Sequence, residues 1–395
     1  MTPAVQSQNE PLSPEARSAL VGDLLKTSRR AADASGSLVG TSFAVKDLID
    51  LRGWPTGAGR VPPQTRAPAA TDAPIVARFK SAGAVAVAKT RTDELGLATF
   101  SPGVINPFDR TRSVGGSSGG SAVAVATGLV GFALATDTAG SARIPAAAAG
   151  VVGLCLPAGW ESRDGVVGLS ETFDRLGVIT SSCDRLVSIM AGMGDLPGRG
   201  DAQRIWTLSP DTVGRVDPHW ARAADEVARR VAERWDLELA GPLDVEPLSA
   251  FGAARGTVIT ADAVTRHRAA DATTDVVRAQ LEAGAKQDHA DVAAARRELA
   301  RLGAQYRNAL GPDLLVMPTL PSAPPRWSDI ETVPDQLRAI GWMTRLCAPA
   351  NSSALVSTSI PYGVDPDGLP IGVQLIAADL PLVLAATEAC GRECR

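Results

Sequence analysis

The chain has 395 residues, of which 45% are hydrophobic and 21% are charged, a composition typical of a globular protein with a large buried core. Its net charge of -4 gives no sign of the basic surface that nucleic-acid binding needs, and no uninterrupted apolar run predicts a membrane span. The N-terminal segment lacks the apolar block of a signal peptide, and the five cysteines are scattered and odd in number, so we expect reduced thiols and a cytoplasmic location.

The first expected elements are a short helix and a strand that ends at a lysine. Residues 1–12 are polar and contain proline, which predicts a loose tail. Ser13 and Pro14 then mark a helix start, with serine as the N-cap and proline at the first helical position. Residues 41–45 form a run typical of a strand, and Lys46 stands at its end.

Lys46 is one of few lysines in a chain that is rich in arginine. If the strand end is buried, desolvation lowers the pKa of this lysine from its ordinary value of about 10.4 and allows the neutral amine to act as a base. A lysine in this position can equally extend its ammonium group along the surface to solvent. The segment by itself leaves both interpretations open.

Residues 71–90 predict a second helix and a second strand. Residues 71–74 (TDAP) open the helix, and residues 84–88 (AVAVA) form an apolar strand. Residues 83–90 superficially resemble a phosphate-binding loop, but Ala88 occupies the position where that loop requires glycine before Lys-Thr. The sequence therefore argues against nucleotide binding here.

The stretch from residue 115 to 145 combines two small-residue loops with an uncharged apolar segment between them. Residues 115–121 are GGSSGGS, and residues 136–143 are TDTAGSAR. The intervening run predicts a buried helix and strand that hold the two loops at a fixed separation. Functional residues concentrate on loops that a rigid scaffold positions, although Gly/Ser tracts also serve as flexible linkers. A linker is rarely continuous with buried elements, so we expect a functional site here.

The serines of this stretch suggest nucleophilic catalysis. Residues 115–119 match the G-x-S-x-G motif of α/β-hydrolases, but that motif needs an apolar strand before it, and residues 106–113 are polar. A Ser-His-Asp triad is poorly supported, because all three histidines lie in charged segments predicted to be helical: His219, His267 and His289. A serine without histidine can instead be activated by a deprotonated lysine, and the turn at Ser141 can direct backbone N–H groups at an oxyanion.

The remainder of the chain predicts further strands and helices. Strands are expected at residues 166–169, 176–179, 313–317, 355–360 and 371–377. Residues 195–215 have an irregular pattern, and helices are expected to begin at Asp217 and near Leu382. The segment 258–310 is charged and predicts helix. Strands that alternate with helices predict an α/β fold built around a mixed sheet.

Three motifs make the chain resemble the amidase signature family of Ser–Ser–Lys amide hydrolases. They are V-K-D at residues 45–47, GGSSGGS at 115–121, and D-x-x-G-S-x-R-x-P at 137–145. Ser117 and Ser141 are 24 positions apart, which is the spacing of the family pattern. The resemblance implies an amidase signature fold, in which a central mixed β-sheet is flanked on both faces by α-helices.

The same resemblance implies a domain layout. Residues 1–395 are expected to form a single amidase signature domain. Within it, residues 1–12 remain the loose tail, and residues 195–310 form a variable, mostly helical region.

The resemblance also implies roles for individual residues. Ser141 is the nucleophile, and Ser117, carried on a cis peptide to Ser118, relays a proton between Ser141 and Lys46. No metal or cofactor is needed. The oxyanion hole is formed by the backbone N–H groups of Thr138, Ala139, Gly140 and Ser141. The residues expected to orient the loops are Ser118, Asp137 and Arg143.

Departures from the family pattern concern specificity. Cys155-Leu156-Pro157 stands where Lys-Pro-Thr is usual, and residues 173–178 (FDRLGV) replace F-D-T-x-G-P. Alanine at position 139, where most members have glycine, makes the motif most similar to that of allophanate hydrolases. We therefore expect the chain to bind and hydrolyse a small, polar or urea-like amide. The resemblance leaves open whether the protein is a homodimer.

Two alternatives to a solitary hydrolase follow from the same resemblance. One is the amidase subunit of a tRNA-dependent amidotransferase, which works with partner subunits. The other is a biosynthetic relative that transfers the acyl group to an amine instead of to water.

Overall fold

A single mixed sheet of ten strands organises the part of the chain that the computed structural model describes, which is residues 12–22, 36–60 and 67–391. The tail predicted at residues 1–12 lies outside these ranges except for its last residue. The strands are β1 (Ser42–Lys46), β2 (Val85–Thr90), β3 (Phe132–Asp137), β4 (Val152–Cys155), β5 (Arg175–Thr180), β6 (Arg204–Thr207), β7 (Glu238–Pro242), β8 (Leu314–Pro318), β9 (Val356–Val364) and β10 (Pro370–Ala377).

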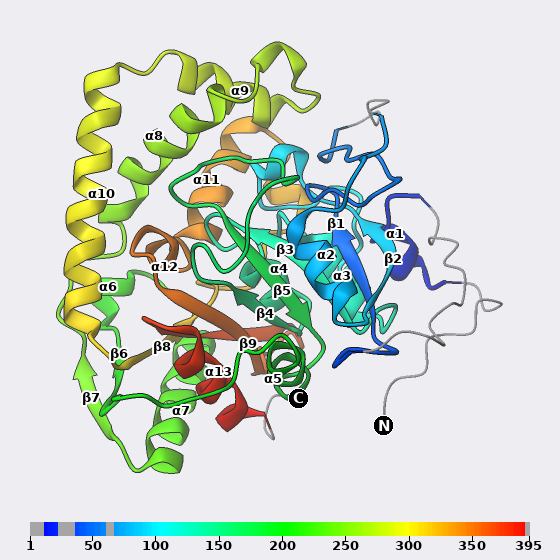
Figure 1. The fold of residues 1–395 in the computed structure, drawn as a ribbon. Coiled ribbons are helices and arrows are strands. Elements are labelled where there is room, and N and C mark those ends of the chain that lie inside the picture. Colours follow the sequence, from blue (N-terminus) through cyan, green and yellow to red (C-terminus); the bar gives the residue numbers. More distant parts are fainter. Residues whose placement is uncertain (1–11, 23–35, 61–66, 392–395) are drawn as a thin grey trace.

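Helices cover both faces of this sheet (Figure 1). They are α1 (Pro14–Ser18), α2 (Pro74–Ser81), α3 (Gly119–Ala126), α4 (Arg143–Ala148), α5 (Cys183–Gly192), α6 (Pro210–Val213), α7 (Pro218–Trp235), α8 (Ala250–Val264), α9 (Asp275–Ala285), α10 (His289–Leu310), α11 (Val333–Thr344), α12 (Ala348–Ser352) and α13 (Leu380–Cys390). Short 3₁₀ turns occur at η2 (Glu94–Gly96), η3 (Ala269–Asp271) and η4 (Trp327–Asp329). No helix in the described ranges combines the length and the apolar character needed to cross a membrane.

The strand order is β2-β1-β3-β5-β4-β9-β10-β8-β6-β7. The strands β2, β1 and β3 run parallel, as do β8, β6 and β7 at the other end. Between these groups, β5, β4, β9 and β10 pair antiparallel with their neighbours. The mixed sheet with flanking helices that the sequence predicts is confirmed.

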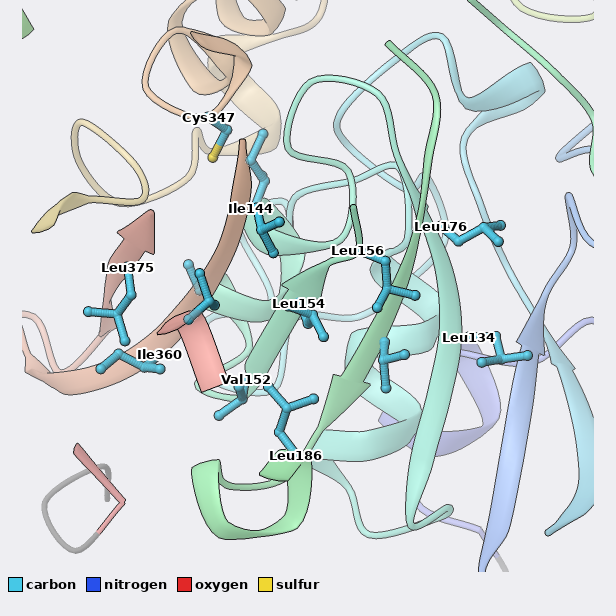
Figure 2. Close-up of a cluster of buried hydrophobic side chains, with 14 of the residues drawn as sticks. Leu134, Ile144, Val152, Leu154, Leu156, Leu176, Leu186, Cys347, Ile360 and Leu375 are labelled. Carbon is cyan, nitrogen blue, oxygen red and sulfur yellow. The ribbon is translucent and has the colours of Figure 1, made fainter. Parts of the chain in front are cut away.

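Side-chain size differs between the two faces of β3, because successive residues of a strand point to opposite sides. Phe132 and Leu134 join a cluster of large side chains that includes α2 and α5, whereas Ala133 and Ala135 face the small residues of α3 and α4. Figure 2 shows the bulky face, where Leu134 lies near side chains from β4 and β5. Small residues on the other face let α3 and α4 approach the sheet closely. The loops that precede these two helices therefore lie next to the edge of the sheet.

The other half of the sheet is covered in the same way. Leu314 and Val316 of β8 pack with residues of α7 and α13, while Leu315 and Met317 pack with α8 and α10 on the opposite face. Figure 1 shows α7 and α13 below this part of the sheet and α8 above it. Figure 1 also shows α11 and α12 on the same side of the sheet as α8.

Several boundary predictions are confirmed, two are wrong, and some elements were not predicted. The helix starts at Ser13 and Asp217 are correct, since both side chains accept a hydrogen bond from the first turn of the helix that follows. The strand predicted at residues 166–169 is reduced to one isolated bridge between Ile49 and Val166. Residues 195–215, predicted to be irregular, contain β6 and α6, and the strands β4 and β7 were not predicted. The hydrophobic pattern of β6 does not indicate a strand, because Ile205 is the only buried residue in it.

Candidate active site

Lys46 lies at the centre of the site, at the C-terminal end of β1. Its Nζ atom is 2.7 Å from Ser117 Oγ, 2.8 Å from Ser118 Oγ and 2.8 Å from Thr136 Oγ1. The side chain is completely buried. The structure thus brings three of the predicted residues together and adds Thr136, which the sequence analysis did not single out.

Burial sets the proton affinity of this lysine. Removal from water lowers the pKa of Lys46 to about 7, although the negative charges of Asp93, Asp137 and Asp174 favour the ammonium form. A substantial fraction of Lys46 is therefore neutral at physiological pH. The alternative of a surface lysine reaching into solvent is wrong.

The loop that carries Ser117 is held by a carboxylate that the sequence analysis missed. The cis peptide bond joins Gly116 to Ser117, and not Ser117 to Ser118 as predicted. Asp93 packs against Gly116 and accepts hydrogen bonds from the backbone N–H groups of Phe100 and Ser101. Any side chain at position 116 would collide with this carboxylate, which explains the need for glycine there. The position of Asp93 just after β2 was the available signal, because chemistry often lies beyond the carboxyl ends of parallel strands.

The turn that carries Ser141 is organised by Asp137 at the end of β3. The carboxylate of Asp137 accepts hydrogen bonds from the N–H groups of Gly140 (2.7 Å) and Ala142 (3.2 Å). The N–H of Gly140 is thus committed to Asp137, which removes it from the predicted oxyanion hole. The N–H groups of the other three predicted donors, Thr138, Ala139 and Ser141, form no hydrogen bond with a residue that the structure describes, so they remain open to a ligand.

Backbone contact joins the two serine loops. The N–H of Ser118 donates to the carbonyl oxygen of Ser141 at 3.1 Å. Ser141 is 6% exposed, and within the described ranges its hydroxyl forms no hydrogen bond, either to Ser117 or to another residue. The Ser117 hydroxyl is already at Lys46, so one contact of the predicted relay is formed and the other is not.

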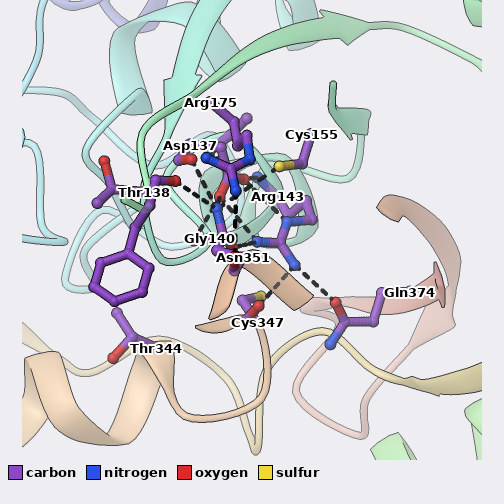
Figure 3. Close-up of polar contacts among 12 residues, drawn as sticks. Asp137, Thr138, Gly140, Arg143, Cys155, Arg175, Thr344, Cys347, Asn351 and Gln374 are labelled. Atoms are coloured by element: carbon purple, nitrogen blue, oxygen red, sulfur yellow. Dashed lines mark hydrogen bonds and ion pairs between the residues drawn. The ribbon is translucent and has the colours of Figure 1, made fainter. Parts of the chain in front are cut away.

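A buried ion pair fixes the Ser141 turn to the rest of the fold (Figure 3). Arg143 Nε and Nη2 donate to the two carboxylate oxygens of Asp137 at 3.0 and 2.9 Å. Arg143 also donates to the carbonyl oxygen of Cys347 and to the side chains of Asn351 and Gln374. Burial alone would raise the pKa of Asp137, but the charge and hydrogen bonds of Arg143 outweigh it and hold the pKa at about 2.

Breaking this ion pair should destabilise the protein strongly. Arg143→Met leaves the Asp137 carboxylate buried without its countercharge, and we expect the free energy of unfolding to fall by about 3 kcal/mol or more. The matched control is Arg338→Met, which removes an arginine whose ion pair with Asp335 is exposed; we expect a loss of about 1 kcal/mol or less. Urea unfolding followed by circular dichroism measures both. Equal losses in the two variants would contradict the anchoring role of Arg143.

Asp174, the residue before β5, supports the Ser141 turn. Its carboxylate accepts the Thr138 hydroxyl at 2.7 Å and the N–H groups of Leu169 and Ser170 at 2.8 and 3.0 Å. Burial raises the pKa of this carboxyl group. The segment that departs from the family pattern therefore touches the Ser141 turn directly. Beside it runs a crevice of about 10 Å³, lined by residues that include Gly96, Thr136, Thr138, Arg163, Asp174 and Arg175.

The histidines do not contribute to this arrangement. His219 lies at the start of α7 and contacts Asp217, and His267 contacts the carbonyl oxygen of Gly168. Neither shares a hydrogen bond with a serine of the two loops. The geometry assembles serine and lysine without histidine.

Comparison with known proteins agrees with this geometry. A family model described as Amidase matches residues 13–206 and 221–380. The chain is 32% identical over 397 residues to a glutamyl-tRNA(Gln) amidotransferase subunit from Halobacterium salinarum, covering 87% of this chain and 92% of the relative. It is 29% identical to the 2-amino-5-chloromuconic acid deaminase of Comamonas testosteroni, covering 86% of this chain and 78% of that protein. A crystal structure described as an amidase superposes with a TM-score of 0.80 at 28% identity, covering 95% of this chain and 91% of that one.

Proposed function

This chain belongs to the amidase family, and on that premise we propose that it hydrolyses the C–N bond of a small, polar or urea-like amide through an acyl-enzyme on Ser141. The observation that carries the proposal is a fully buried lysine with a pKa lowered to about 7, whose Nζ lies 2.7 Å from a serine hydroxyl. A lysine that is neutral at physiological pH can act as a general base for that serine.

The first half of the proposed reaction forms the acyl-enzyme. Neutral Lys46 accepts a proton from Ser117, and Ser117 takes the proton of Ser141 as the Ser141 oxygen attacks the amide carbon. The free N–H groups of Thr138, Ala139 and Ser141 are the proposed donors to the negative oxygen of the tetrahedral intermediate. Substrate binding must bring the two hydroxyls into contact, and such contacts often tighten only in the complex. The proton then passes to the nitrogen that leaves as ammonia or an amine.

The second half releases the product. A water molecule attacks the ester carbon on Ser141 and gives up its proton through Ser117 to Lys46. The carbonyl re-forms, the bond to the Ser141 oxygen breaks, and that oxygen recovers a proton. The proposal needs no metal and no cofactor. An amine in place of water would make the same site an acyltransferase.

Three observations support a small, polar substrate. Two arginines, Arg163 and Arg175, line the crevice next to Thr138, and their charges favour a polar substrate. Alanine at position 139 matches the pattern of allophanate hydrolases. That this chain acts on a similar substrate stays a prediction. The Comamonas relative is named for a small acid.

An amidotransferase subunit is the second candidate, because the Halobacterium relative is similar over nearly its whole length. Such a subunit works with partner subunits, whereas a solitary amidase acts alone. The two candidates therefore differ in whether the purified single chain releases ammonia from simple amides.

The test is ammonia release by the purified single chain from a panel of amides. The panel contains allophanate, malonamate, aliphatic amides and aryl amides. We expect turnover of at least one small polar amide and little turnover of long-chain amides. If no amide is hydrolysed, the solitary amidase is excluded, and the amidotransferase or acyltransferase becomes the function to test.

A further inference from the structure

Helix α8 carries two buried charged side chains, and only one of them is neutralised. Asp262 accepts a hydrogen bond from Ser170 and forms an ion pair with Arg296. Arg255 is 7% exposed, and its guanidinium donates to Thr344 Oγ1 at 2.9 Å and to the Thr344 carbonyl oxygen at 3.4 Å. Among the described residues, Arg255 forms no ion pair with a carboxylate.

An unpaired buried guanidinium is unusual because removing its charge from water costs free energy. Burial lowers the pKa of Arg255 to about 10, so the side chain is still charged at neutral pH. A guanidinium has five N–H donors, and the two acceptors of Thr344 do not use them all. A neutral side chain could make the same two hydrogen bonds. The positive charge of Arg255 therefore has no countercharge among the described residues of the free protein.

The position of Arg255 links it to the Ser141 turn. The N–H of Cys347 donates to the Thr344 carbonyl oxygen at 3.2 Å, so these two residues are the ends of one tight turn. Cys347 packs against Gly140 so closely that a Cβ atom on Gly140 would lie 2.6 Å from Cys347 Cβ. Arg255 and Gly140 thus contact opposite ends of a segment about 5 Å long, and Gly140 directly precedes Ser141.

The same helix also contacts the segment on the other side of that turn. Phe251 of α8 packs in one hydrophobic cluster with Phe173, the residue before Asp174. Asp174 in turn holds the Thr138 hydroxyl. Helix α8 is therefore linked to the Ser141 turn twice, by Arg255 through the Thr344–Cys347 segment and by Phe251 through the cluster that contains Phe173.

We propose that Arg255 binds a carboxylate on the acyl part of the substrate, which makes amides of dicarboxylic acids the preferred substrate class. This inference rests on the amidase function proposed above. A carboxylate offers two oxygens that match the forked N–H donors of arginine, and in a site shielded from water the pair is strong. Binding there fixes the acyl chain at the end remote from the amide, and so orients the amide carbon toward Ser141.

The kinetic test compares succinamate with butanamide, two amides of equal chain length that differ in the terminal carboxylate. In the wild type we expect a clear preference for succinamate. Arg255→Met should lower kcat/KM for succinamate by about 10²-fold, mainly through KM, and leave butanamide almost unchanged. Arg255→Lys should recover part of the loss. The matched control is Arg307→Met, another arginine that donates to a backbone carbonyl, that of Ser353 at 2.9 Å, and it should change neither substrate.

A binding measurement separates this inference from the proposed function. Calorimetric titration with succinate should show binding to the wild type and to Arg307→Met, and none to Arg255→Met. If succinate binds in this way but no amide is hydrolysed, the anion site stands and the amidase function fails. Parallel loss of both substrates in Arg255→Met, no preference for succinamate, or no succinate binding to the wild type would each overturn the assignment of Arg255. Thermal unfolding of each variant shows whether it is folded.

Discussion

Replacing Ser141 with alanine is expected to lower kcat for amide hydrolysis by on the order of 10⁴-fold or more. The substitution removes the proposed nucleophile, and the Thr138 hydroxyl on the same turn is already hydrogen-bonded to Asp174. In the described structure the Ser141 hydroxyl makes no hydrogen bond, so its loss should leave the fold intact. Ammonia release measures the rate, and mass spectrometry of enzyme quenched during turnover should detect an acyl adduct on Ser141 in the wild type only.

The matched control for Ser141 is another buried serine of the glycine-rich loop. Ser121 Oγ contacts Thr90 Oγ1 at 2.8 Å and the Leu134 carbonyl oxygen at 3.3 Å, and it has no part in the proposed proton relay. We expect Ser121→Ala to keep kcat within about tenfold of the wild type, because it removes only neutral hydrogen bonds. A Ser141→Ala enzyme that keeps activity comparable to this control would show that another residue is the nucleophile.

Strong strands were predictable from the sequence because their burial pattern is local. In β3 every residue is buried, and the flanking loops carry glycines and serines that mark its ends. The strands β6 and β7 lie at one edge of the sheet, and most of their residues are partly or fully exposed. An edge strand of this kind has neither an apolar run nor a clean alternation, so its pairing is set by neighbours that the local sequence does not reveal.

The candidate catalytic residues were predictable because a family pattern marks them, while their environment was not. Lys46 reaches Thr136, which is 90 positions away, and the burial that lowers its pKa comes from segments that are equally distant in sequence. Asn351 donates to the carbonyl oxygen of Asp137 across 214 positions. No local motif marks either contact. They follow from the topology, which sets the end of β3 beside α12.

Lys46 should control the pH dependence of the reaction. Its pKa of about 7 means that the neutral base is lost as the pH falls, so kcat/KM should be constant above about pH 8 and fall about tenfold per unit below about pH 6. Lys46→Met should lower kcat by on the order of 10³-fold or more and abolish this acidic limb. Initial rates measured from about pH 5 to about pH 9 with buffers of constant ionic strength test both statements.

Substitution of Asp174 gives a second test of the role of Lys46, because it predicts the direction in which the acidic limb moves. The negative charge of Asp174 favours the ammonium form of Lys46, so Asp174→Asn should lower the pKa of the lysine and move the acidic limb to lower pH. Asparagine keeps one oxygen that can accept the Thr138 hydroxyl but loses the oxygen that accepts from the N–H groups of Leu169 and Ser170, so thermal unfolding of the variant is measured beside its pH profile. Asp137 cannot produce the limb, because Arg143 holds its pKa at about 2 and it stays charged throughout the measured range. A limb that moves to higher pH in Asp174→Asn, or that persists in Lys46→Met, would show that a group other than Lys46 is the base.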